Sequence, residues 1–416
     1  MKGKLKKIYK NPMFFIFIII LIFYAPLAIY SPGESRNRGV VTAVGIDKLG
    51  DEYEISLLTF IPTINQSFEE QKSIISGKGE SVAQAVYRAQ IAMGRKVGLF
   101  HAKTTIVNEE LLQEDVTQHL DYLSRVASLP ENTVFVATNK TAKELLSLSQ
   151  ISKSNTGLKL EQIVGFNAEN LYVTDTSLEA FYEGYYSDVK SSIIGYLCVE
   201  EEGSSNVFAS VEKASMSEDR GSDMSQEGGG QQSGKKKESL INCGKSILLK
   251  DGKMAEILDV DMLNAVNLLN TKSLNQIIRI KDVEKNGQIL NLDYKVLDKQ
   301  VIKTSKFENG YPVFVAKVNL GINLVEVEGA KEDVKFNTEL SDINKEIENK
   351  LNNQIKGNFS KAIDMLKKNN ADVLEINREF FTNNRGEYLN FIHANGGAEN
   401  FLRHVTFKLI VSVEPD

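Results

Sequence analysis

The residues able to bind metals or carry protons are few and scattered in this sequence. The four histidines, His101, His119, His393 and His404, form neither the i, i+4 pair nor the Cys/His cluster typical of a zinc site. No G-x-S-x-G motif occurs, although the members of a Ser-His-Asp site can lie far apart in sequence. We therefore expect hydrogen-bonded structural histidines and predict no catalytic, cofactor-binding or metal-binding residue.

The segment SGKGES, residues 76–81, is the stretch that most suggests a phosphate cradle. A P-loop requires G-x-x-x-x-G-K-[ST], whereas here Lys78 precedes the second glycine, Gly79. A dinucleotide-binding turn needs a further glycine that is missing. We predict a plain turn between a strand and a helix.

The two cysteines, Cys198 and Cys243, are too few for a disulfide framework. Both lie in strand-like runs on opposite sides of a low-complexity loop. If these strands pair, one disulfide could close that loop in an oxidising compartment. The alternative is two buried free thiols that pack as small hydrophobic groups.

Charge is distributed unevenly along the chain. Five lysines precede residue 11, so the remainder carries a net charge of −11, five below the −6 of the whole chain. An acidic body argues against a nucleic-acid partner, because phosphate binding needs a basic surface.

Residues 13–30 form an almost wholly apolar run, MFFIFIIILIFYAPLAIY. Its roughly 18 residues lie at the lower limit for a helix that crosses a bilayer. The run is long for the core of a cleaved secretory signal, and no clear A-x-A cleavage site follows, so we predict an uncleaved anchor. In either case the lysines indicate a cytoplasmic N-terminus and an exported body.

Composition divides the exported body into three parts. Residues 31–213 are predicted to form an N-terminal domain, with a subdomain break near 151–170, where the pattern is less regular. Residues 214–239 are rich in Gly, Ser, Gln and charge, which indicates a solvated flexible loop rather than a recognition tail. Residues 240–416 are predicted to form a C-terminal domain.

Strands and helices alternate in the N-terminal part. Residues 40–46 and 53–60 read as two strands, and Ser81 is placed to cap a following helix with an apolar stripe. The order β-β-α-β-α-β-α predicts helices packed on a mixed sheet. The expected fold class is α+β, with α/β-like character: an N-terminal transmembrane helix followed by two to three mixed-sheet domains packed with helices.

The second half begins with a strand pair that turns at Asp251 and Gly252. Strands are then predicted at residues 290–296, 301–307 and 314–322. An amphipathic helix over residues 341–368 follows, with apolar residues at steps of four and three. An alternating strand at 405–413 closes the chain.

Several segments, in the same order, resemble the Ger(x)C family of spore germination proteins. The first half carries VVTAVGIDKLGDEYEISLLTFIP, then SGKGESVAQAVYRAQIAMGRKVGLFHAKTTIVNEEL, then LDYLSRVASLPENTVFVAT. The second half carries INCGKSILLKDGKMAEILDVDMLNAVNLLN and LKKNNADVLEINREFF. Positions that match the family pattern, with roles the resemblance does not assign, are Gly45, Asp47, Arg95, Lys96, Phe100, His101, Arg125 and Asp372.

The chain also departs from the family pattern. Members are typically lipoproteins whose lipid-bearing cysteine shortly precedes the VTAIGID-like strand, whereas residues 28–31 here contain no cysteine. The apolar run must then act as the anchor alone, and a spanning helix holds a protein in the membrane without lipid. A tryptophan of the C-terminal segment is also missing, since the sequence has none.

The resemblance implies a non-enzymatic subunit of a germinant receptor at the spore inner membrane, with its body on the extracytoplasmic face. It implies two integral-membrane partners, one receptor-type and one transporter-like, and no cofactor. Two other classes stay open at this point. One is an exported solute-binding or adhesion protein, and the other is an extracytoplasmic hydrolase with scattered catalytic residues.

Overall fold

The structure is a computed structural model. It describes Ile16, Ile20 and residues 38–61, 71–148, 156–169, 172–174, 176–201, 239–269, 276–285, 288–329 and 345–415. The predicted anchor, apart from the two isoleucines, and nearly all of the predicted loop at 214–239 lie outside these residues. No helix within the described ranges is long and apolar enough to cross a membrane.

The first sheet is mixed, as predicted. In spatial order its strands are β3 (Gln71–Gly79), β2 (Glu52–Ile61), β1 (Arg38–Leu49), β5 (Thr104–Asn108), β6 (Val134–Thr138), β7 (Ser191–Glu201), β8 (Ser239–Lys250) and β9 (Lys253–Asp259), and the short β4 (Lys96–Gly98) also pairs with β1. The central strands β1, β5, β6 and β7 run parallel, with antiparallel pairs at both ends. Every residue of β5 and β6 is buried, as expected for parallel strands covered on both faces.

Helices cover both faces of this sheet. On one face lie α4 (Val82–Met93), α5 (Val116–Arg125), α9 (Leu178–Tyr185) and the 3-10 turn η1 (Leu111–Gln113). The opposite face is covered by α6 (Ala142–Ser147) and α8 (Thr156–Glu169). The predicted cap of α4 is confirmed, because Ser81 Oγ accepts the backbone N–H of Gln84 at 3.2 Å.

The irregular segment predicted near 151–170 is in large part the helix α8. Leu160 and Val164, four residues apart, are buried against the sheet from one side of this helix. Only a narrow apolar stripe of α8 packs on the central strands β1 and β5, so the helical period is weak in the sequence.

The strand pair at 239–259 belongs to the first sheet, although it lies at the start of the stretch predicted to form the C-terminal domain. β8 pairs with β7 over its length, with Ile241 opposite Val199 and Leu248 opposite Ile193. The β8–β9 turn also contacts α5, since Gly252 O accepts the backbone N–H of Val116 at 3.0 Å. Asp251 and Gly252 have φ values of 53° and 75°, which fits the tight hairpin predicted there.

The second sheet has four strands in the order β10 (Ile277–Lys285), β11 (Gln288–Glu308), β12 (Tyr311–Glu328) and β13 (Thr406–Pro415). β13 runs parallel to β12, and the other pairs are antiparallel. The strands predicted at 290–296 and 301–307 are one strand, β11. A bulge between Val296 and Asp298 shifts the alternation by one residue and makes one strand read as two. β10 was not among the predicted strands.

Helices cover one face of the second sheet. They are α11 (Val260–Asn267), α13 (Lys345–Asn369), α14 (Ile376–Asn383), α15 (Arg385–Ala394), the 3-10 turn η2 (Ala398–Asn400) and α16 (Phe401–His404). The predicted stripe of α13 is confirmed, because Ile347, Leu351, Ile355 and Phe359 are buried in the core beneath it.

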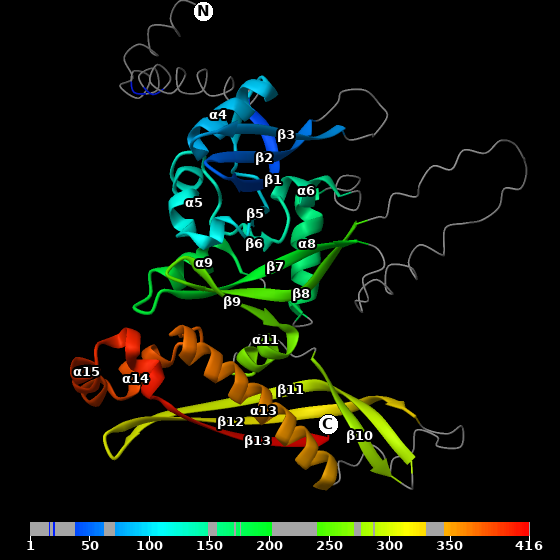
Figure 1. The fold of residues 1–416 in the computed structure, drawn as a ribbon, viewed down its shortest axis with the longest axis vertical. Coiled ribbons are helices and arrows are strands. Elements are labelled where there is room, and N and C mark those ends of the chain that lie inside the picture. The colour runs from blue at the N-terminus through cyan, green and yellow to red at the C-terminus, as the bar shows by residue number, and fades with distance from the viewer. Residues whose placement is uncertain are drawn as a thin grey trace, which may run out of the picture.

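A shared hydrophobic core joins the two sheets. Leu248 of β8 and Leu258 of β9 belong to the same buried cluster as Val266 of α11, Leu351 of α13 and Leu292 of β11. Figure 1 shows the sheets one above the other along the long axis, with α11 between them. The molecule is therefore a mixed α+β protein whose two halves are connected by packing as well as by the chain.

Candidate functional site

Two residues of the VTAVGID strand hold helix α6 against β1. The Asp47 carboxylate accepts the backbone N–H groups of Ala142 at 2.6 Å and Lys143 at 3.2 Å, at the start of α6. Burial raises the pKa of Asp47 to about 6, and the two backbone hydrogen bonds oppose that rise. Gly45 provides the space, because a Cβ there would lie 2.6 Å from Ala142 Cβ.

Asp372 binds the start of helix α14 in the same way. Its carboxylate accepts the backbone N–H groups of Ile376 at 2.9 Å and Asn377 at 2.7 Å, and also the Asn377 side-chain amide at 2.9 Å. Tyr388 then donates its hydroxyl to Asn377 Oδ1 at 2.9 Å. The carboxylate is buried and thus closes the start of the helix rather than facing a ligand.

Three other family-matching residues lie on the surface. Arg125 pairs with Asp121 one turn earlier on α5, with Nη2 and Oδ2 at 3.0 Å. Arg95 and His101 are exposed on either side of β4, and the His101 ring lies 4.4 Å from that of Phe100. The structure does not bring these residues together with Asp47 or Asp372.

A polar network around His119 was not predicted. Tyr53 OH lies 3.0 Å from His119 Nδ1, within hydrogen-bond distance, whereas Glu114 Oε2 lies 3.4 Å from Nε2 without meeting hydrogen-bond geometry. Lys48 Nζ donates to Glu114 Oε1 at 2.6 Å. Burial lowers the pKa of His119, with the charge of Glu114 acting in the opposite direction. Tyr53 and His119 are 66 positions apart in the sequence, which explains why no local spacing indicated the pair.

Both cysteines are buried free thiols in the structure, which agrees with the second of the two alternatives, and no disulfide joins them there. Cys198 packs into the core on the α4 face of the first sheet, and Cys243 packs into the core on the α6 face. Side chains on opposite faces of a sheet point apart, which disfavours a bridge. Burial raises the pKa of Cys198 to about 11 and that of Cys243 to about 12, as expected of unreactive buried thiols.

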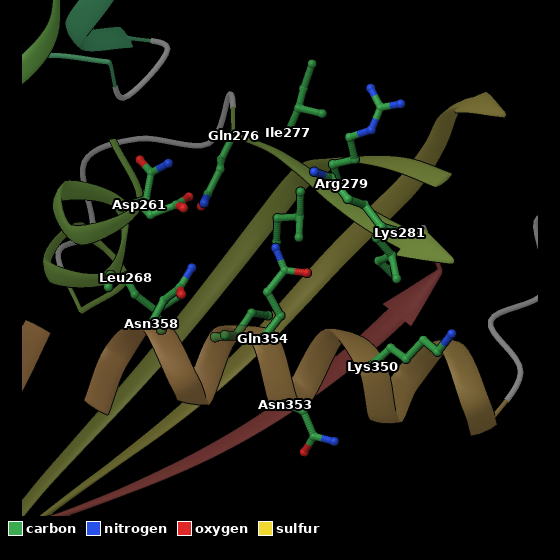
Figure 2. Close-up of a pocket in the computed structure, with 15 residues that line it drawn as sticks. Asp261, Leu268, Gln276, Ile277, Arg279, Lys281, Lys350, Asn353, Gln354 and Asn358 are labelled. Carbon is green, nitrogen blue, oxygen red and sulfur yellow. The ribbon is translucent and has the colours of Figure 1, made fainter. Parts of the chain in front are cut away.

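A groove of about 660 Å³ lies between α11, β10 and α13. Figure 2 shows Gln276 and Gln354 directed into the space between these elements, and Asn358 directed toward α11. The only carboxylate among its described lining residues is that of Asp261, beside neutral amides and aliphatic side chains. Such a lining can hydrogen-bond a polar group but offers no nucleophile with a neighbouring base.

Two of the three cations that line this groove, Arg279 and Lys350, already have protein partners. Arg279 pairs with Glu328 and lies 3.6 Å from Asp293, Nη1 to Oδ2. Lys350 Nζ donates to the backbone oxygen of Asp282 at 2.5 Å. Elsewhere in the described ranges, no three His, Cys, Asp or Glu side chains are grouped so that they could bind a metal ion.

Comparison with known families gives the identity of the chain. Residues 33–199 match the spore germination protein N-terminal domain, and residues 244–413 match the spore germination B3/GerAC-like C-terminal domain. The chain belongs to the Ger(x)C family of spore germination proteins. The resemblance predicted from the ordered segments is therefore confirmed.

Relatives of this Ger(x)C protein agree with the assignment. Spore germination protein KC of Bacillus subtilis strain 168 is 23% identical over 358 residues, covering 82% of this chain and 80% of the relative. The crystal structure of the GerBC protein has a similar fold, with a TM-score of 0.51 at 13% identity, and covers 89% of this chain and 96% of its own.

Proposed function

We propose that this chain is a membrane-anchored, non-catalytic subunit of a spore germinant receptor, required for nutrient-triggered germination. The observation that carries the proposal is the match to both germination domains, in order, over most of the body. The buried carboxylates support a structural reading, because Asp47 and Asp372 bind backbone N–H groups at helix starts. In this proposal the protein acts by assembly rather than by breaking bonds.

The proposed partners are two integral-membrane subunits of the receptor, one receptor-type and one transporter-like. Holding the body at the same membrane raises its effective concentration for these partners without adding any new contact. The proposed location is the spore inner membrane, with the body on its outer face and the N-terminal lysines in the cytoplasm.

The proposed anchor is the apolar run at residues 13–30, acting without a lipid because residues 28–31 contain no cysteine. Mass spectrometry of the protein from spore membranes tests this point. The expected N-terminal peptide begins at or beside Met1, and a mature chain that begins near Ile29 would rule out the anchor.

Gene deletion tests the function. Spores that lack this protein should fail to germinate with nutrients and should germinate normally with a trigger that bypasses the receptors. Complementation with the intact gene is the control. A normal nutrient response in the deletion, in a strain with no paralogue, would contradict the proposal. Co-purification from the spore inner membrane then identifies the subunits that bind it.

A further inference from the structure

An exposed basic and apolar surface lies at the end of the first sheet where strand β1 begins. Ile91, Phe100 and Val126 are 64%, 43% and 51% exposed there, although all three are large hydrophobic residues. Exposed basic side chains stand among them. We call this the α4–β4 surface, and its members are Ile91, Arg95, Lys96, Phe100, His101 and Val126.

Backbone pairing gathers these residues from three elements. The first residue of β4, Lys96, is opposite Arg38, the first residue of β1. Helix α4 ends directly before β4, at Gly94. The segment after α5 lies beside them as well, because the backbone N–H of Leu99 donates to Ala127 O at 3.2 Å. The α4–β4 surface therefore lies where the chain enters the domain.

The sequence places this end of the first sheet close to the predicted anchor. Arg38 lies eight positions after Tyr30, the last residue of the apolar run. Even a fully extended chain of that length reaches only about 28 Å. If residues 13–30 span the membrane, the start of β1 and the residues paired with it cannot lie far from the lipid headgroups.

The charge of the surface differs from that of the body. No carboxylate pairs with Arg95 or Lys96 among the described residues, whereas the chain beyond residue 10 has a net charge of −11. Basic side chains strengthen binding to an anionic leaflet about fivefold each, and protruding aromatic and aliphatic groups insert at the headgroup level.

We propose that the α4–β4 surface rests on the anionic lipid headgroups of the membrane that holds the anchor. This inference rests on the proposed function only through the anchor at residues 13–30. The contact sets the orientation of the body. Figure 1 shows α4 at the end of the molecule opposite to β10–β13, so the second sheet is directed away from the bilayer.

Lipid quenching of a label on the full chain in vesicles tests this contact. An Ile91→Cys variant and an Ile410→Cys control are each labelled with a fluorophore; Ile410 is 50% exposed on β13, and both native cysteines are buried. The vesicles contain phosphatidylcholine, with or without phosphatidylglycerol, and a nitroxide-bearing lipid as quencher.

We expect strong quenching at residue 91 and little at residue 410, with phosphatidylglycerol needed for the full effect. Arg95→Glu with Lys96→Glu should lower quenching at residue 91 to the control level. Reversing the exposed Lys317 and Lys408 on the second sheet should leave it unchanged.

The outcomes separate this inference from the proposed function. A chain that does not float with vesicles would contradict the anchor itself. If the chain floats but quenching at residue 91 equals that at residue 410, the lipid contact is wrong and the anchor stands. If quenching is absent while the Arg95/Lys96 reversal weakens co-purification with receptor subunits, the surface binds protein and the lipid proposal is overturned.

Discussion

His119 is one buried side chain that makes the stability of the first domain depend on pH. It is 5% exposed, with Tyr53 at Nδ1 and Glu114 near Nε2, while Lys48 and Asp115 add their charges nearby. The loss of water around the ring favours the neutral form, so the folded-state pKa lies below the ordinary 6.5. A hydrogen-bonded buried histidine matches the structural reading predicted from its isolated position.

The first prediction concerns this residue. The unfolded chain binds a proton at His119 near pH 6.5 and the folded chain only at lower pH, so the stability present above pH 6.5 is lost as pH falls. A His119→Gln variant should therefore lose less stability than the wild type between pH 7 and the more acidic range.

Urea unfolding of both proteins across this pH range measures the difference. The contribution of Asp47 to the free energy of unfolding depends on pH in the opposite sense, because its raised pKa of about 6 makes this contribution greatest at acid pH. Asp47 is present in both proteins, so its contribution cancels in the comparison. Parallel pH profiles for variant and wild type would contradict the prediction.

At the scale of elements, short contacts decide how each helix sits on its sheet. Helix α6 has only six residues, too few to be stable alone, and the Thr141–Glu144 capping box closes its start. Asp47 then fixes its first turn to β1, and Gly45 allows the close approach. This arrangement gives a physical reason for Gly and Asp at the two positions that match the family pattern.

A Gly45→Ala substitution tests this arrangement. The added Cβ would lie 2.6 Å from Ala142 Cβ, so α6 must shift, and we expect a loss of about 1–3 kcal/mol in the free energy of unfolding. Gly357→Ala on α13 is the matched control. It meets no atom within 4 Å and should be neutral or stabilise by about 0.5–1 kcal/mol. Equal effects in thermal unfolding would argue against the close contact.

For the whole molecule, the shared core predicts that the two sheets are coupled. Leu258 lies on β9 of the first sheet but packs in the cluster formed mainly by the second sheet and α13. Its neighbour Ile257 is 41% exposed and is a control on the same strand.

A Leu258→Ala variant should lose about 2–5 kcal/mol, because a cavity forms in the joint core. Hydrogen exchange should show weaker protection in both β8 and β11. Ile257→Ala should have a much smaller effect. Weaker protection confined to β8 and β9 would show that the two halves unfold independently.

Local patterns in the sequence were sufficient to predict many of the elements. The stripe of α13, the Ser81 cap and the turn at Asp251 and Gly252 depend on residues within a few positions of one another. Periods of 2 and 3.6 and turn chemistry act at this range, which is why they can be read from one sequence. The Ger(x)C family was indicated separately, by the resemblance of several ordered segments to that family.

Only the tertiary structure decided which distant residues meet. It placed β8 and β9 in the first sheet, the two cysteines on opposite faces, and Tyr53 beside His119. It also gathered α4, β4 and the end of α5 into one surface beside the start of β1. These contacts depend on strand order and register. Several strands share a similar apolar pattern and could pair in more than one way, so local patterns in the sequence do not select the pairing. The burial that selects among them exists only once the chain has packed.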